Sequence, residues 1–124
     1  MYDHHPMRHM SLEAALNELQ GTQLGSVEFV RSYVQFHFDG PTLNAYTLPS
    51  VLVNRSHLVP GDSGYRDALC ERIGIPVARA SVSEILVTLV FQDEAIFSIS
   101  LRSEDYVGAE AVEYVDRLGR IWVG

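Results

Sequence analysis

The chain has 124 residues, of which 47% are apolar, 20% charged and 10% aromatic, and its formal net charge is −7. These values are typical of a single globular domain and exclude the disordered, collagen-like and disulfide-rich classes. All nine basic residues are arginine and sixteen carboxylates outnumber them, so the positive stripe that binds nucleic acid is not expected.

The first predicted element follows a short lead-in. Residues 1–10 show no periodicity and include Pro6, so we predict a flexible N-terminal segment followed by one domain over 11–124. From Ser11 onward, leucine and alanine recur at helical spacing, and Gly21 stands where a helix ends. This pattern predicts an amphipathic helix over 11–20 with Ser11 as its N-cap.

A period of two, typical of strands with one buried face, begins soon after this helix. It predicts strands over 26–31, 33–38 and 42–48, which together form a three-strand meander. A short hairpin of 51–53 with 57–59 follows. Because Pro49 precedes it, we expect the hairpin to lie near a sheet edge.

The second half begins with another helical pattern, over 62–73, which Asp62 or Ser63 caps and Gly74 ends. Three more strands are predicted over 77–83, 84–91 and 95–101. Both alternating sets of the middle strand are largely apolar, which favours a central strand covered on both faces. Residues 108–115 fit either a short helix or an irregular strand, and 121–123 fit a final strand.

The two halves show a weak internal repeat. At an offset of 53, Val34, Phe36 and Phe38 align with Val87, Leu89 and Phe91. Any two antiparallel meanders can align in this way, and an old duplication is the alternative. Under either interpretation the predicted fold class is α+β, a mostly antiparallel sheet of two three-strand meanders with one N-terminal and one central helix.

No catalytic, cofactor or metal site is predicted. The string 61–64 matches the residues around a serine-protease nucleophile, but Ser63 stands where the helix needs a cap, and no histidine motif of those enzymes accompanies it. His4, His5 and His9 with Asp3 could hold a metal only loosely, because a flexible segment does not fix ligand geometry. Cys70 is expected to be an inert, partly buried thiol.

The acidic residues are the most suggestive feature. Residues 81–124 carry eight carboxylates against three arginines, a local balance of −5, whereas residues 1–80 carry eight against six, a balance of −2. Such a surface can steer a basic protein partner. The residues that we expect to bind this partner are Asp93, Glu94, Glu104, Asp105, Glu110, Glu113 and Trp122.

Two other functions stay open. The aromatic residues Tyr33, Tyr46, Tyr106, Tyr114 and Trp122 could line a pocket, which predicts a small-molecule-binding or catalytic β-rich domain near Tyr46, Tyr106 and Trp122. Alternatively, unpaired strand edges could make the chain a self-associating homodimer. The single cysteine and the lack of a signal-peptide or membrane-spanning pattern favour a cytoplasmic protein that binds neither membrane nor nucleic acid.

A loose resemblance covers most of residues 24–123. The segments that carry it are 38–43, 64–69, 100–111 and 119–123. In these segments the chain resembles small uncharacterised bacterial domains, some of which are similar to immunity proteins encoded beside secreted toxins. The resemblance implies a small, acidic, non-enzymatic protein that neutralises a basic partner, and it assigns a role to no individual residue.

Overall fold

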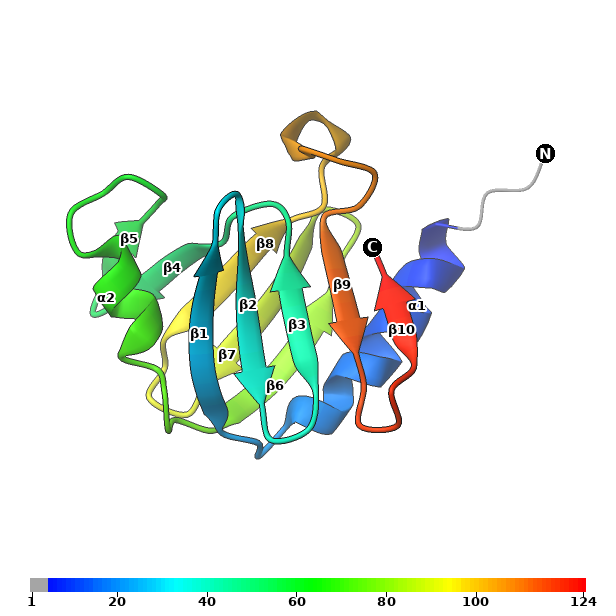
Figure 1. Cartoon of the computed structure of the whole chain (residues 1–124), viewed down its shortest axis with the longest axis horizontal. Helices are drawn as coiled ribbons and strands as arrows, with labels where there is room; N and C mark the ends of the chain where they lie inside the picture. Colours follow the sequence, from blue (N-terminus) through cyan, green and yellow to red (C-terminus); the bar gives the residue numbers. More distant parts are fainter. Residues whose placement is uncertain (1–4) are drawn as a thin grey trace.

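The computed structural model describes the backbone of residues 5–124 and the side chains from residue 11 onward. It is an α+β domain in which two five-stranded antiparallel sheets pack against each other (Figure 1). The first sheet has the order β1-β2-β3-β9-β10, with β1 (Leu24–Val30), β2 (Tyr33–Phe38), β3 (Thr42–Ala45), β9 (Val112–Val115) and β10 (Ile121–Val123). The second has the order β5-β4-β8-β7-β6, with β4 (Ser50–Val53), β5 (Ser56–Leu58), β6 (Val77–Val82), β7 (Leu86–Phe91) and β8 (Ile96–Ser100).

The core lies between the sheets. Along β2 the residues alternate between half-buried and buried, and the buried set is the predicted one, Val34, Phe36 and Phe38. Phe36 reaches across to Phe97 of the second sheet, with ring centroids 5.1 Å apart. The period of two in the sequence therefore identified the inward face correctly.

Two helices fill the open sides between the sheets. Helix α1 (His5–Leu16), followed by the 3₁₀ turn η1 (Asn17–Leu19), packs against β6 and β10, and helix α2 (Tyr65–Cys70) packs against β1 and β4 (Figure 1). Because both helices lie at the sides, neither covers the outer face of a sheet. Within residues 5–124, no helix is long and apolar enough to cross a membrane.

Helix α1 corrects the first predicted boundary. It begins at His5, so Ser11 lies inside the helix and does not cap it. Pro6 falls in the first turn, where its missing N–H costs no hydrogen bond, so proline does not stop a helix there. The helix and η1 end at Leu19, one residue before the predicted end. The first four residues of the predicted flexible segment lie outside the described residues.

Helix α2 is half as long as predicted, and the predicted caps are wrong. Its N-cap is Gly64, at φ +84°, which has no side chain that could cap the helix. Asp62 instead accepts a hydrogen bond from the Val59 N–H at 2.9 Å and closes the preceding turn. The stripe of Tyr65 and Leu69 is buried as predicted, but Ile73 is 44% exposed, because the chain has left the helix before it.

The strands follow the predictions more closely. The hairpin of β4 and β5 forms, and β5 lies at a sheet edge as predicted. Residues 112–115 form strand β9, which decides between the two alternatives left open for this region. The prediction that β7 is covered on both faces is wrong, because Val87, Leu89 and Phe91 are buried while the alternate residues are only half-buried. The two predicted meanders are also incomplete as a description, since each sheet has five strands.

The two halves of the chain are related by a pseudo-twofold arrangement. The Gly21 N–H donates to the Val77 carbonyl at 2.8 Å, and at an offset of 53 the Gly74 N–H donates to the Leu24 carbonyl at 2.7 Å. Strands β1 and β6 have a register shift at the same place, after Leu24 and after Val77. A chance alignment of two meanders does not require such matched contacts, so they favour the duplication.

The last hairpin of each half pairs with the sheet that the other half forms: β4 and β5 join β6–β8, and β9 and β10 join β1–β3. Strand β4 of the first half pairs with β8, and β9 of the second half pairs with β3. From the strand partners, Ala45 corresponds to Ile99 and Ser50 corresponds to Glu113. Four residues lie between Ala45 and Ser50, whereas thirteen lie between Ile99 and Glu113. The β8–β9 loop is therefore nine residues longer than its counterpart.

Candidate functional site

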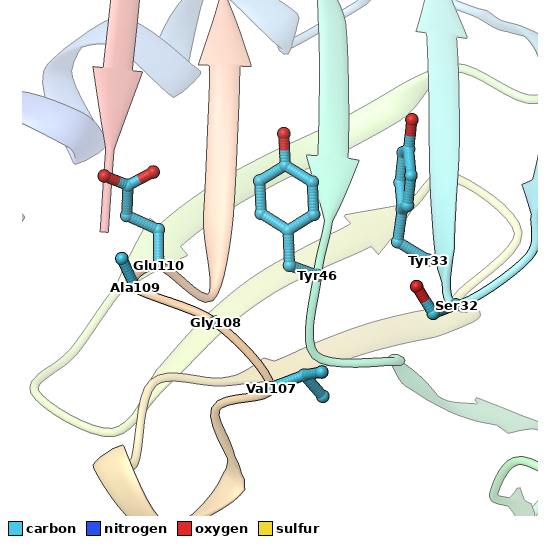
Figure 2. A pocket seen from close by; sticks show the side chains of 7 residues that line it. All are labelled: Ser32, Tyr33, Tyr46, Val107, Gly108, Ala109 and Glu110. Carbon is cyan, nitrogen blue, oxygen red and sulfur yellow. The ribbon is translucent and has the colours of Figure 1, made fainter.

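A pocket of about 300 Å³ opens on the outer face of the first sheet, beside this longer loop (Figure 2). We call it the tyrosine pocket, and its lining is Ser32, Tyr33, Tyr46, Val107, Gly108, Ala109 and Glu110. Tyr33 and Tyr46 stand side by side, with ring centroids 5.2 Å apart, and Glu110 lies on the other side of Tyr46 (Figure 2). The β8–β9 loop therefore supplies one wall and the first sheet supplies the other.

Local structure explains why these side chains meet. Tyr33 is the first residue of β2, and it points outward because its neighbour Val34 points into the core. Tyr46 directly follows β3, and its backbone N–H donates to the Ala111 carbonyl at 2.7 Å. This hydrogen bond holds the end of the β8–β9 loop against β3 and brings Glu110 next to the tyrosine.

Glu110 lines the pocket, and Glu113 and Asn44 pair with each other on the same face of the first sheet. Burial, followed by Glu113, Tyr33 and Glu110, raises the pKa of Tyr46 above its ordinary value. Asn44 lies two residues before Tyr46 and is 7% exposed. Its Nδ2 donates to Glu113 Oε1 at 3.2 Å, while its Oδ1 has no partner among the described residues. A positively charged group with N–H donors fits this environment best.

Four of the predicted partner-binding residues lie at or near this pocket. Glu110 lines it and Glu113, on β9, faces the same side of the sheet as Asn44. Glu104 and Asp105 belong to the same loop, in the exposed 3₁₀ turn η2 (Ser103–Asp105). Among the described side chains, none of these four carboxylates forms an ion pair with an arginine.

Two predicted residues lie elsewhere. Asp93 and Glu94 are in the β7–β8 turn, at the opposite end of β8 from the β8–β9 loop (Figure 1). Asp93 Oδ2 lies 3.2 Å from Nε of Arg72, whose side chain is only 8% exposed. Asp93 therefore neutralises a buried cation, and the structure separates both residues from the tyrosine pocket.

Trp122 is also separate from the pocket. Its side chain is half-buried against the core, and the indole Nε1 donates to Asp116 Oδ2 at 3.0 Å. Tyr106 packs against the core as well, and Tyr114 is fully buried. Of the aromatic residues proposed to line a pocket, Tyr33 and Tyr46 do so, whereas Tyr106, Tyr114 and Trp122 do not line the tyrosine pocket.

Asp116 gives the fold a defined dependence on pH. Burial alone raises its pKa, but hydrogen bonds from Trp122, the Arg120 backbone and side chain, and the Leu118 N–H outweigh burial and hold the pKa well below its ordinary value. The unfolded chain, in which an aspartate has a pKa of about 3.9, therefore binds this proton first as the pH falls.

We expect the stability that Asp116 contributes above about pH 4 to be lost as the pH decreases below that value. Urea unfolding of the wild type and of Asp116→Asn from about pH 6 to pH 2 tests this. The variant should be less stable at pH 6, and the difference should narrow at low pH. A difference that stays constant over this range would contradict the assignment.

The other candidate groups show no reactive arrangement among the described residues. No cluster of three histidine, cysteine or acidic side chains occurs there, and the side chains of Asp3, His4, His5 and His9 lie outside the described part. Cys70 is half-buried, and burial followed by Asp67 raises the pKa of its thiol, as an inert thiol requires.

Sequence reasoning missed Asn44 and Ser32. Asn44 is one polar residue in a predicted strand, and only the register that places it opposite Glu113 shows its role. A usable signal was present in the alternation of Asn44 with Tyr46, which puts both on one face.

No protein-family model matches the chain, and comparisons with curated proteins and with solved structures found no significant match.

Proposed function

We propose that this protein is a non-enzymatic interaction domain that binds a basic protein partner through the β8–β9 loop and the tyrosine pocket. Neutralisation of a toxin, as by an immunity protein, is its most concrete form. The observation that carries the proposal is the placement of Tyr33 and Tyr46 beside Glu110, a carboxylate that forms no ion pair with an arginine among the described side chains. A partner's arginine is the expected occupant.

The physical argument has two parts. A guanidinium or ammonium group is attracted to the face of a tyrosine ring and to a carboxylate, and arginine and tyrosine often dominate interface energies. The exposed carboxylates Glu104 and Asp105 extend the negative charge along the loop, which accelerates association with a basic partner. The loop that supplies these groups is nine residues longer than its pseudo-twofold counterpart.

Binding of an arginine-rich peptide to two charge-matched variants tests the proposal. The loop variant is Glu104→Gln, Asp105→Asn and Glu110→Gln, and the control is Asp39→Asn, Asp67→Asn and Glu94→Gln. We expect the loop variant to lose about tenfold in affinity at low salt and the control less than about threefold. Equal losses would show that net charge alone attracts the peptide, and affinity that is independent of salt would also contradict the proposal.

The variant Tyr46→Ala tests the contribution of the tyrosine pocket to binding separately from that of the β8–β9 loop. If a side chain of the peptide enters the pocket, this change should weaken binding about fivefold, with little change in the salt dependence. The proposal that the protein neutralises a toxin has a separate test, the identity of the neighbouring genes. A large secreted protein encoded directly upstream would support it, whereas a metabolic operon would favour a small-molecule-binding domain.

A second function, binding of a small molecule, is favoured by one observation, the further pocket described below. Self-association is a third prediction, which light scattering at micromolar concentration tests.

A further inference from the structure

A second pocket, of about 350 Å³, shares Tyr33 with the tyrosine pocket. We call it the arginine pocket. It lies where α2 packs beside β1, and its walls combine apolar and cationic side chains. Its lining includes Phe29, Arg31, Leu48, Pro60, Tyr65 and Arg66. Its volume is at the lower end of the range for ligand-binding pockets, so it suits a small molecule.

The charge of this pocket is opposite to that of the whole chain. Its lining contains Arg31 and Arg66 and no carboxylate, although the protein carries a net charge of −7. The Arg66 guanidinium lies over the Phe29 ring, 4.8 Å from its centroid. Among the described side chains, neither arginine forms an ion pair with an acidic residue.

Tyr65 contributes no negative charge. Its hydroxyl donates to the Pro49 carbonyl at 2.6 Å, and burial raises its pKa to about 12, although Arg66 opposes the shift. The tyrosine is therefore neutral at physiological pH, and no anion of the lining compensates the two guanidinium groups. A ligand that supplies a negative charge would complete the pocket.

The pseudo-twofold arrangement relates this contact between α2 and β1 to the contact between α1 and β6. At the offset of 53, Arg31 corresponds to Glu84 and Arg66 corresponds to Glu13. At this equivalent contact, Glu13 Oε2 of α1 accepts a hydrogen bond from the Val82 N–H of β6 at 2.6 Å. Val82 corresponds to Phe29, over which Arg66 lies. Equivalent positions thus carry opposite charges, and the cationic pair occurs only beside the arginine pocket.

Arg31 is retained in a backbone conformation that disfavours it. It is the first residue of the two-residue turn between Val30 and Tyr33, and its φ is +31°. Glycine is the residue favoured where the first position of such a turn has a positive φ, because other side chains clash with the backbone there. Arg55 and Glu94, in other turns of the chain, also have a positive φ.

We propose that the arginine pocket binds a small organic anion, a carboxylate attached to an apolar group. The carboxylate would pair with Arg31 and Arg66, and the apolar group would pack against Phe29, Leu48 and Pro60. The arginine pocket shares only Tyr33 with the tyrosine pocket and no residue with the β8–β9 loop, so the proposal does not depend on the proposed partner-binding function.

Titration of the ¹⁵N-labelled protein with octanoate, followed by NMR, tests the proposal, with 1-octanol and octylamine as matched probes. We expect octanoate to bind saturably below about 10 mM and to shift the amide resonances of Phe29, Arg31 and Arg66. The alcohol and the amine should bind at least about fivefold more weakly, because they lack the negative charge.

Arginine variants then identify the contacts. Arg66→Gln and Arg31→Gly should each weaken octanoate binding about fivefold, whereas Arg79→Gln, on the exposed face of β6, should not. Arg31→Gly should keep or raise the Tm, which shows that its loss of binding is not unfolding. The loop variant of Glu104, Asp105 and Glu110 should bind octanoate as the wild type does.

Three results would overturn the proposal. These are the absence of saturable binding up to about 10 mM, equal binding of octanoate and octanol, and an equal loss in Arg79→Gln. The first would mean that the pocket has no such ligand. The second would mean that it is only an apolar recess, and the third that net charge alone attracts the anion.

Discussion

Replacement of Phe97 by alanine is expected to lower the free energy of unfolding by about 3–5 kcal/mol. Phe97 is fully buried in β8, and its ring contacts Phe91 of the same sheet, with centroids 4.7 Å apart, and Phe36 of the other, at 5.1 Å. The substitution removes apolar contacts and leaves a cavity that two rigid sheets cannot close. Urea unfolding measures the change, which corresponds to a fall in Tm on the order of 10–20 °C.

The neighbouring residue provides the control. Ser98 is half-buried on the outer face of the same strand, so Ser98→Ala should change the unfolding free energy by less than about 0.5 kcal/mol. Comparable losses in the two variants would mean that the sheets do not pack through Phe97.

The second large effect is expected at Asp93. The substitution Asp93→Asn should destabilise the fold by about 2 kcal/mol, because it removes the nearer and less exposed counter-charge of the Arg72 guanidinium, which is 8% exposed. The other carboxylate, Glu71, lies 3.6 Å from Nη2 and is 67% exposed, so it compensates the cation less. The cost is below that of a fully buried pair because Asp93 is itself 34% exposed. The amide can still accept the hydrogen bond from the Ala95 N–H, so the variant tests the charge and spares the turn.

The pseudo-twofold arrangement suggests a matched variant. At the offset of 53, Arg72 corresponds to Leu19, which is fully buried. Two of the Arg72 nitrogens, Nε and Nη1, lack a hydrogen-bond partner among the described residues. Arg72→Leu should therefore be neutral or stabilising. In that background Asp93→Asn should cost less than about 0.5 kcal/mol, and a cost of about 2 kcal/mol there would contradict the role given to the pair.

The partner-binding hypothesis depends on charge counts, which locate acidic residues along the chain and not in space. Asp93 and Glu110 belong to the same acidic third of the sequence, yet they lie beyond opposite ends of β8. Trp122 and Tyr46 were grouped as aromatic residues, and the sheet turns one toward the core and the other outward. Spacing in the sequence cannot show which of these acidic and aromatic residues lie near the tyrosine pocket and which lie elsewhere.

By itself the sequence determined the α+β class, most of the strands and their buried faces, because alternation with a period of two is a local property of the chain. It also contained the offset of 53 that relates the two halves. Tertiary structure alone decided the exchange of the last hairpins, the joining of β3 to β9 and β4 to β8, and so both pockets. The reason is that pairing between strands far apart in sequence depends on which edges are left unpaired after the core has closed, and no local pattern encodes that choice.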